Sequence, residues 1–298
     1  MKVATDWKDY EIIDMADGEK LERWGNINLI RPDPQIIWKE KSFPEAWKKA
    51  DARYNRSSSG GGGWKYNKRL PDNWQIKYKK LTFNIKPMGF KHTGLFPEQA
   101  VNWDWMIDKI RNAGREIKVL NLFAYTGGAT VACSFAGASV VHVDSSKGMV
   151  SWAKENIASS GLSDRPVRLI IDDVTKFVQR EIRRGNKYDA IIMDPPSYGR
   201  GKNGEVWQFE NNISDLVKLC SEVLSDNPLF FLINSYTTGI SSKVLENILY
   251  LNLSQNKELS SKTRENISKG KFESGEVGLP MKDSKLILPC GIYSRWEA

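Results

Sequence analysis

The feature that most constrains the fold is a regular alternation of apolar runs and amphipathic stretches after about residue 97. Five apolar runs are each followed by a stretch of helical periodicity, which predicts an α/β fold with a doubly wound parallel sheet. Runs such as VLNLF and AIIM suit strands buried on both faces. The predicted strands are Lys118–Phe123, Ser139–Val143, Val167–Ile171, Tyr188–Met193 and Leu229–Asn234, and the predicted helices are Glu98–Asn112, Ala129–Ala136, Lys147–Ser160, Val174–Arg184, Asn211–Leu224 and Ser242–Leu253.

The two ends of the chain follow other patterns. Near the C-terminus, Leu286–Leu288 and Ile292–Trp296 are separated by Pro289-Cys290-Gly291, which predicts a turn between two edge strands. We therefore predict a small β-rich domain over residues 1–85 and a larger α/β domain over residues 86–298. In the first domain we expect strands at Ile27–Ile30, Gln35–Lys39, Gln75–Tyr78 and Leu81–Ile85, and a short helix over Phe43–Tyr54 that Ser42 caps.

Several classes of protein are disfavoured by composition. The longest strongly apolar run, Leu229–Ile233, is far shorter than the ~20 residues that span a bilayer. The first 14 residues contain no apolar segment of a secretory signal. The three cysteines of the 298-residue chain are too few and too scattered for a disulfide framework or a zinc site. We expect a cytoplasmic protein with no metal and no membrane association, either a monomer or a homodimer.

The positive charge is concentrated in one segment. Residues 39–91 contain 14 Lys and Arg against four acids, a net charge of +10, whereas the whole chain carries +8. The same segment contains nine aromatic residues. Basic side chains interleaved with aromatic rings suit RNA, because phosphates need counter-charge and unstacked bases need flat partners. The alternative is a small β-domain with an aromatic core and a solvated lysine face.

Ligand-binding residue types follow four of the predicted strands. In an open α/β sheet the ligand lies beyond the carboxyl ends of the strands. The first strand is followed by Ala124-Tyr125-Thr126-Gly127-Gly128, whose glycines allow a tight bend and close approach to a ligand. The second ends at Asp144, which can accept hydrogen bonds from a ribose diol. The third is followed by Asp172-Asp173-Val174, where an acid can bind an adenine amino group, and the fourth by Asp194-Pro195-Pro196-Ser197-Tyr198.

Each of these signals has a simpler interpretation. Asp144 and Asp173 could be helix caps, and the Gly-rich and Pro-rich stretches could be ordinary turns. Their occurrence in order, at four strand ends, favours a nucleotide-like ligand. A nicotinamide dehydrogenase is disfavoured, because residues 124–129 lack the G-x-G-x-x-G spacing that brings a pyrophosphate onto a helix N-terminus. A cofactor without phosphates has no such requirement.

With these motifs, residues 85–298 resemble the class I S-adenosylmethionine-dependent methyltransferases. The nearest branch contains the bacterial large-subunit ribosomal RNA methyltransferases that modify cytosine carbon 5 or guanine nitrogen 7. The resemblance implies a Rossmann-like sheet, mostly parallel with an antiparallel edge hairpin, S-adenosylmethionine as the cofactor, and RNA, above all ribosomal RNA, as the substrate. Its carriers are Thr93-Gly94-Leu95-Phe96-Pro97-Glu98-Gln99, Val119–Gly128, Val143-Asp144-Ser145-Ser146, Asp172-Asp173-Val174 and Asp194-Pro195-Pro196-Ser197-Tyr198.

The resemblance also implies roles for single residues. The upstream segment would cover the cofactor, the glycine-rich loop would line its methionine part, and the acids after the second and third strands would bind its ribose and adenine. The implied cofactor-binding residues are Thr93, Phe96, Gln99, Asn121, Phe123, Ala124, Tyr125, Thr126, Gly127, Asp144, Ser145, Asp173, Val174 and Asp194. The implied catalytic set, which faces the target atom, is Asp194, Pro195, Pro196 and Tyr198.

One departure from these relatives bears on the target atom. Methylation of cytosine carbon 5 needs a Cys thiolate that attacks carbon 6, and the stretch after the fifth strand, residues 234–238, contains no Cys. An amine, a ring nitrogen or a ribose oxygen stays open as the target. Asp194 and the Pro195 carbonyl can accept hydrogen bonds from an amine while Tyr198 stacks on a flipped base, although Ser197 separates that ring from Pro-Pro. The basic stretch Gly199–Gly204 fits a substrate lid or a solvated loop.

Three functions are therefore carried forward. The first is an S-adenosylmethionine-dependent methyltransferase that acts on a base in RNA, with Asp194-Pro195-Pro196 positioning the target atom. The second is a methyltransferase for a small molecule or a protein. The third is a non-catalytic RNA-binding module that retains the fold, which the four intact strand-end motifs disfavour.

Overall fold

The computed structural model describes residues 1–57, 61–200 and 205–298. They form two compact units. The N-terminal unit comprises Lys2–Val101 together with Val277–Cys290, and the C-terminal unit comprises Met1, Asn102–Glu276 and Gly291–Ala298. The N-terminal unit thus extends to residue 101 and includes a segment from near the C-terminus. Each unit is described by itself.

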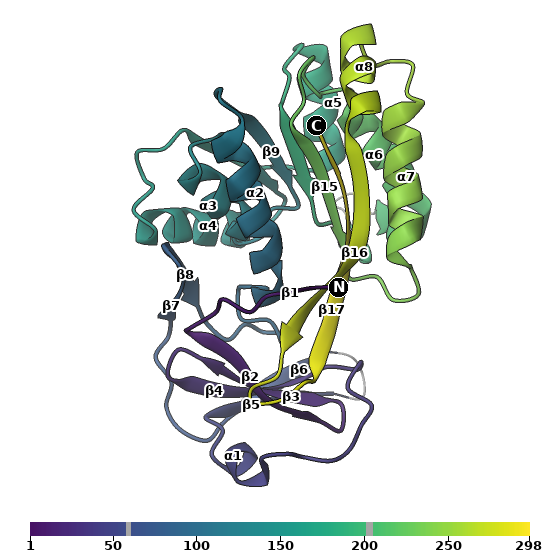
Figure 1. Ribbon diagram of the computed structural model, residues 1–298. Helices are drawn as coiled ribbons and strands as arrows, with labels where there is room; N and C mark the ends of the chain where they lie inside the picture. The colour runs from purple at the N-terminus through teal and green to yellow at the C-terminus, as the bar shows by residue number, and fades with distance from the viewer. Residues whose placement is uncertain (58–60, 201–204) are drawn as a thin grey trace. The chain divides into compact units, whose positions relative to one another are not determined.

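The C-terminal unit is built on five parallel strands, all at predicted positions (Figure 1). The central strand β9 (Lys118–Leu122) pairs with β10 (Ser139–Asp144) on one side and with β12 (Ala190–Met193) on the other. Beyond them, β11 (Val167–Ile171) pairs with β10, and β15 (Phe230–Ser235) pairs with β12. The order β11-β10-β9-β12-β15 is the doubly wound arrangement, and the strand order reverses between β9 and β12.

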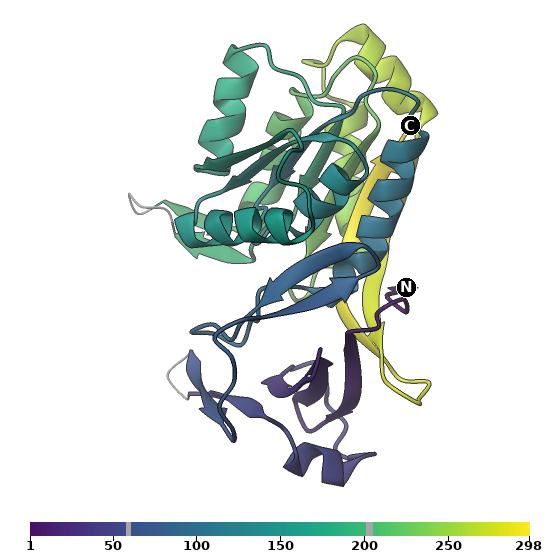
Figure 2. The same cartoon turned by 90° about the vertical axis from the view of Figure 1, so that its left-hand side faces the viewer.

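Helices cover both faces of this sheet (Figure 2). Alternate residues of each strand point to opposite faces. One face meets α2 (Ala100–Asn112), which follows a 3₁₀ turn at Pro97–Gln99, and α3 (Gly128–Phe135): Trp105 of α2 contacts Phe230, and Thr130 of α3 bonds Asn121. The other face packs Leu120, Ile191 and Phe231 against an apolar core. That core is formed by α5 (Val174–Arg183), α6 (Phe209–Ser221), α7 (Ser242–Ser254) and α8 (Ser261–Lys269), while α4 (Lys147–Ser159) contacts β10 and β11.

The antiparallel edge is a long hairpin of β16 (Lys271–Pro280) and β17 (Ile287–Glu297). β17 runs antiparallel to β15, with Trp296 opposite Phe231. The predicted turn at Pro289-Cys290-Gly291 is wrong, because β17 continues through it and the amide of Met281 closes the real turn onto the carbonyl of Leu286. A continuous strand buries Leu288 and Trp296 completely, which a turn would not. The short β1 (Lys2–Val3) pairs with residues 277–278 of β16.

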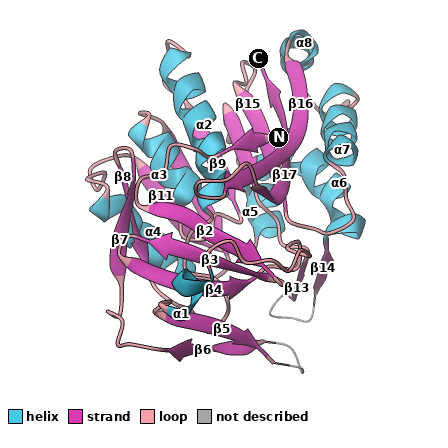
Figure 3. Ribbon diagram, turned by 60° about the horizontal axis from the view of Figure 1, so that its bottom comes forward, coloured by secondary structure: helices cyan, strands magenta, loops and turns pink. Residues whose placement is uncertain are grey.

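The N-terminal unit contains a five-stranded sheet in chain order (Figure 3). A short helix, α1 (Pro44–Lys48), lies in the connection between its parallel strands β4 and β5. Leu21, Ile30 and Trp47 form a small buried core. The strands are β2 (Tyr10–Ala16), β3 (Glu19–Trp24), β4 (Ile27–Pro32), β5 (Ala52–Arg56) and β6 (Gly62–Tyr66), and a separate hairpin follows with β7 (Trp74–Tyr78) and β8 (Leu81–Ile85).

Two expectations for this unit are corrected. Residues 35–39 form no strand, because only the amides of Asp17 and Gly18, at the β2–β3 turn, donate to carbonyls of this stretch. The helix expected over Phe43–Tyr54 is confined to α1, and its second half is β5. Ser42 is not the cap. The carboxylate of buried Asp14 instead accepts the Phe43 amide at 2.9 Å and the indole Nε1 of Trp47 at 2.8 Å, a long-range contact that local sequence patterns do not encode.

A buried ion pair joins neighbouring strands of the N-terminal sheet. The carboxylate of Glu22 accepts hydrogen bonds from Arg31 Nε at 2.6 Å and from the Tyr10 hydroxyl at 2.6 Å, and all three side chains are buried. Burial raises the pKa of Glu22, but the charges of Arg31 and Lys20 outweigh it and hold the pKa at about 2. Arg31 also donates through Nη1 to the carbonyl of Lys91 at 3.1 Å, which ties the residues after β8 to the sheet.

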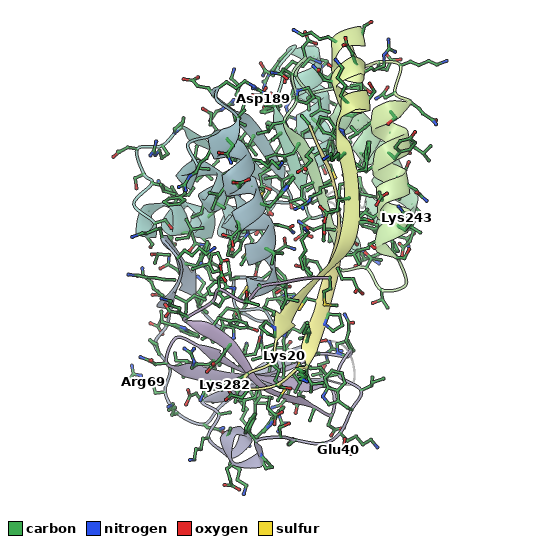
Figure 4. All side chains as sticks on the ribbon, viewed as in Figure 1. Lys20, Glu40, Arg69, Asp189, Lys243 and Lys282 are labelled. Atoms are coloured by element: carbon green, nitrogen blue, oxygen red, sulfur yellow. The ribbon has the colours of Figure 1, made fainter. Side chains whose placement is uncertain are left out.

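We predict that Glu22→Gln lowers the free energy of unfolding by about 3 kcal/mol, because Arg31 would stay buried without its counter-charge. Chemical unfolding of the full chain, followed by tryptophan fluorescence, measures this loss. The control is Glu40→Gln, which changes an exposed carboxylate of the same unit (Figure 4) and should have little effect. Because the pKa of Glu22 is lowered in the folded state, its contribution should be full above pH 4.5 and lost as the pH falls toward 2. Equal unfolding midpoints for the two variants would contradict the prediction.

Candidate functional site

The register of the parallel sheet brings four predicted motifs to one edge. Leu122 of β9 pairs with Val143 of β10 and with Met193 of β12, and Met193 pairs with Ile233 of β15. Asp144 of β10 pairs with Ile171 of β11. The segments that begin at residues 123, 145, 172 and 194 therefore leave the sheet side by side, as predicted for the carboxyl ends of parallel strands.

The loop after β9 has an unusual backbone conformation. Phe123 and Tyr125 adopt positive φ values of 52° and 50°, and Gly127 adopts 83°. Positive φ costs an L-residue with a large side chain about 1 kcal/mol or more, so surrounding contacts must impose it. A Cβ on Gly127 would also lie 3.0 Å from the Cβ of Ala153. This position therefore excludes other residues on two grounds, and the loop can approach a ligand closely with its backbone.

Asp144 holds this loop in place. Its Oδ2 accepts the amide of Tyr125 at 2.9 Å, and its Oδ1 accepts the amide of Ser146 at 2.8 Å. Ser146, not Asp144, is the N-cap of α4, since its side chain accepts the Met149 amide. Each carboxylate oxygen can accept further hydrogen bonds. Half-buried Asp144 next to exposed Ser145 therefore still has acceptor capacity for a diol.

Buried polar side chains form hydrogen bonds next to this loop and with its backbone. Asn121 donates through Nδ2 to Thr130 Oγ1 at 2.9 Å, and the same hydroxyl lies 2.9 Å from Nδ1 of His142. Burial lowers the pKa of His142 to about 4, which keeps its ring neutral at neutral pH. From α4, buried Asn156 donates to the carbonyl of Thr126 at 2.8 Å. Thr130, His142 and Asn156 were not among the predicted site residues, because their role depends on contacts between helices and strands.

The acids after β11 are engaged in local contacts. Asp173 is the N-cap of α5, since its carboxylate accepts the Lys176 amide at 2.9 Å. Asp172 forms an ion pair with Arg180. Asp173 is exposed, whereas the side chain of Val174 is buried in the core of the unit. The capping interpretation of Asp173 is thus correct, and its proposed contact with an adenine amino group would use the other carboxylate oxygen.

The segment after β12 presents Asp194 and Tyr198 at the sheet edge. Asp194 is half-buried, Pro195 is buried, and Pro196 is exposed. Tyr198 is 50% exposed, and its hydroxyl accepts Nε of Arg200 at 3.0 Å. The fixed φ of the two prolines stiffens this turn. An exposed ring four residues after a half-buried carboxylate offers a stacking surface for a planar substrate, and the carboxylate can accept hydrogen bonds from it.

The stretch Gly199–Gly204, for which the sequence left a substrate lid and a solvated loop open, begins as a hairpin. β13 (Tyr198–Arg200) pairs antiparallel with β14 (Val206–Gln208), while residues 201–204 lie outside the described part of the chain. Trp207 of β14 donates through Nε1 to the carbonyl of Pro196 at 2.5 Å. Its ring lies 5.7 Å from the ring of Phe123, between centroids. Trp207 therefore connects the two loops of the candidate site, and no local motif marked it.

The upstream residues belong to the other unit. Thr93, Phe96 and Gln99 lie in the N-terminal unit, whereas the strand-end residues lie in the C-terminal unit. Thr93 is fully buried, and its Oγ1 has no hydrogen-bond partner among the described residues. Phe96 is half-buried and its ring lies 5.4 Å from that of His92. Their predicted contact with the cofactor stays a prediction.

The cysteines are poorly suited to covalent catalysis. Cys133 and Cys220 are fully buried, and burial raises the pKa of both thiols far above the usual range. Burial also raises the pKa of Cys290. A nucleophilic thiolate needs the opposite environment. Within residues 1–57, 61–200 and 205–298 there is also no cluster of three His, Cys, Asp or Glu that could hold a metal ion, and no helix is long and apolar enough to cross a membrane.

Comparison with known proteins bears directly on this site. The family model described as S-adenosylmethionine-dependent methyltransferase matches residues 49–242. The crystal structure of an S-adenosylmethionine-dependent methyltransferase from Agrobacterium tumefaciens is 35% identical, covers 99% of this chain and 92% of that one, and superposes with a TM-score of 0.88.

Two curated relatives are named as ribosomal RNA methyltransferases. The ribosomal RNA large subunit methyltransferase K/L of Shewanella frigidimarina is 33% identical over 147 residues, which is 49% of this chain but only 20% of that protein. The ribosomal RNA large subunit methyltransferase K of Neisseria meningitidis is 24% identical over 243 residues, which is 78% of this chain and 66% of that protein. The chain thus spans about a fifth of the K/L relative.

We predict that Asp144→Ala raises the dissociation constant for S-adenosylmethionine about 50-fold. The substitution removes the predicted ribose acceptor and two charge-assisted bonds that hold the loop, at Tyr125 and Ser146. Isothermal titration calorimetry measures the constant. Asp164→Ala, which removes an exposed carboxylate from the α4–β11 connection, is the control. A dissociation constant within threefold of wild type would refute the role of Asp144.

We predict that Trp207→Phe lowers kcat for methyl transfer about tenfold, since the phenyl ring keeps the contact with Phe123 but cannot donate to Pro196. Affinity for S-adenosylmethionine should change less than twofold, because the strand-end carboxylates are untouched. The separation of kcat from cofactor affinity distinguishes positioning from a general structural defect. An unchanged kcat would show that the bond to Pro196 is dispensable.

Proposed function

Because the chain belongs to the S-adenosylmethionine-dependent methyltransferases, we propose that it methylates a base in RNA and that ribosomal RNA is its substrate. The observation that carries this proposal is the charge of residues 39–91, a net +10 in a family whose catalytic sheet needs no such excess. The ribosomal names of the two curated relatives support the same substrate class. The proposal extends to a cytoplasmic location, where ribosomal RNA is found.

The described structure supports a polyanion as the partner. Eight exposed basic side chains of residues 39–91 have no ion-pair partner among the described residues: Lys39, Lys41, Lys49, Arg56, Lys65, Arg69, Lys77 and Lys80. By contrast, Lys48, Arg53, Lys68 and Lys79 are paired with acids. Uncompensated cations repel one another and stabilise nothing in the fold, whereas phosphates neutralise them with release of counterions. A small neutral substrate would gain nothing from them.

We assign the cofactor to the carboxyl edge of the sheet. Bound there, S-adenosylmethionine supplies an electrophilic methyl group. The loop over residues 123–127 would surround its methionine part, Asp144 with Ser145 would bind the ribose, and Asp173 with the Val174 amide would bind the adenine. Half-burial of Asp144 would exclude part of the water from its contact with the ribose and strengthen it. Thr93, Phe96 and Gln99, which the resemblance implies as cofactor-binding residues, stay predictions.

We assign the target base to the Asp194 turn. Tyr198 offers an exposed ring for stacking, and Asp194 with the Pro195 carbonyl can accept hydrogen bonds from a base nitrogen that carries hydrogen. Such bonds orient the nitrogen lone pair toward the methyl group and retain the proton that the nitrogen releases. The buried, protonated thiols make a covalent route through cytosine carbon 6 unfavourable. A nitrogen target is therefore favoured over cytosine carbon 5.

We predict that wild-type protein transfers labelled methyl groups from S-adenosylmethionine to ribosomal RNA, and that Asp194→Ala lowers this rate at least 100-fold. Cofactor affinity should remain within threefold, because Asp144 and the loop stay intact. The measurement is scintillation counting of RNA, protein and metabolite fractions, followed by nucleoside analysis. Label in the protein or metabolite fraction alone would replace RNA by another substrate. Full activity of Asp194→Ala would remove Asp194 from the mechanism.

A further inference from the structure

The edge strand β6 presents an aromatic face that the fold leaves open. β6 is the last strand of the five-stranded sheet and pairs only with β5 among the described strands. In the register, Tyr54 lies opposite Trp64 and Arg56 opposite Gly62. Because side chains alternate along a strand, Tyr54, Arg56, Trp64 and Tyr66 project from one side of the hairpin. The sequence GGWKY is short of aliphatic residues that would cover such a side.

Trp64 is the centre of this side. Its ring lies 5.5 Å from that of Tyr54, between centroids, in an edge-to-face contact. Its indole Nε1 donates to the carbonyl of Met88 at 2.9 Å and lies 3.3 Å from the carbonyl of Phe90. The segment after β8 is thus held against the hairpin by the indole, which places the backbone of Phe90 next to Trp64. We call Arg56, Trp64, Tyr66 and Phe90 the Trp64 face.

The rings of this face are exposed to solvent. Tyr66 is 52% exposed and Phe90 is 58% exposed, whereas Tyr54 is only 3% exposed. Of the nine aromatic residues in the basic segment, Trp47, Tyr54, Tyr78 and Phe83 are buried core residues. The aromatic-core alternative therefore accounts for about half of the rings. It does not account for Tyr66 and Phe90. Because these rings are exposed, they lack the stabilisation that burial gives an aromatic ring.

One cation shares the face with these rings. Arg56 is exposed and lacks an ion pair in the described part of the chain. Lys65, which is also exposed, alternates to the other side of the same strand, and exposed Arg69 follows β6 by three residues (Figure 4). Flat rings with an unpaired cation on the same face match a single nucleic-acid strand, because every base has a face for stacking and every phosphate carries charge.

We propose that the Trp64 face binds a single-stranded segment of the RNA substrate, with bases stacked on Tyr66 and Phe90 and a phosphate paired with Arg56. This inference rests on the proposed RNA methyltransferase function and identifies the surface that binds the substrate. Stacking tolerates any base, so the face supplies affinity without sequence preference. Trp64 acts as a positioning residue that holds the Phe90 segment against the hairpin.

The test uses the full-length protein and a fluorescein-labelled, single-stranded RNA of 20 nucleotides with mixed sequence. We expect Tyr66→Ala and Phe90→Ala each to raise the dissociation constant about tenfold in fluorescence anisotropy. Tyr66→Phe should keep wild-type affinity, because the ring is retained. Arg56→Gln should lower the slope of log affinity against log salt by about 0.7, the value for one lost phosphate contact on a single strand.

Matched controls separate the face from exposed rings in general. Phe43→Ala removes a 37% exposed ring of the same unit from outside the Trp64 face, and its dissociation constant should stay within twofold of wild type. Thermal melting points of the Tyr66 and Phe90 variants should equal that of wild type, since exposed rings contribute little to folding. Equal loss of affinity in Phe43→Ala would show a diffuse aromatic surface and overturn the assignment.

The outcome is distinguishable from failure of the proposed function. If wild type methylates RNA and the Tyr66→Ala, Phe90→Ala double variant binds the oligonucleotide with unchanged affinity, the Trp64 face is not the grip and only this inference is overturned. If wild type binds the oligonucleotide through the face but transfers no methyl group to RNA, the proposal that RNA is methylated fails while the binding surface stands. Absence of RNA binding by wild type would overturn the inference itself.

Discussion

The parallel pairing of β9 with β10 and β12 is the constraint on which the candidate site depends. Parallel register places Leu122, Val143 and Met193 in one row, so the segments that follow them start at neighbouring points although they are far apart in the sequence. Helices on both faces bury the strands and leave only their ends for ligands. The site is therefore a consequence of topology first, and of residue identity second. An antiparallel sheet with the same residues would scatter them over two edges.

Within that frame, the loop after β9 is held in a conformation that its own sequence disfavours. Phe123 and Tyr125 have positive φ values, which isolated peptides rarely adopt. Hydrogen bonds to Asp144 and Asn156, both outside the loop, offset the cost of these φ values. One consequence is a division of labour within Asp144, which anchors the loop while retaining acceptor capacity for a ligand. Substitutions at this carboxylate therefore combine a binding defect with a loop defect, unlike substitutions of an exposed acid.

Much of the C-terminal unit could be predicted, because apolar runs such as VLNLF and AIIM identify buried strands without knowledge of their partners. Prediction failed where a distant contact decided the structure. The turn expected at Pro289–Gly291 was overridden by the burial of Leu288 and Trp296 along β17. Trp207 lies in no recognisable motif, because its contacts are with a carbonyl eleven residues away and with the ring of Phe123 in the loop after β9. Residue roles inferred from the resemblance remain predictions, because no ligand contact tests them.

The two units are suited to two different steps of RNA modification, the binding of the RNA and the alignment of the base for methyl transfer. Charge pairing with phosphates is long-ranged and weakens with salt, because it depends on the release of counterions. Alignment of a base with a methyl group depends on short hydrogen bonds in a half-buried site, where salt has little access. Residues 39–91 have the composition for the first task and the strand ends have the geometry for the second. A change in ionic strength should therefore act on substrate capture far more than on the chemical step, which separates these contributions within one chain.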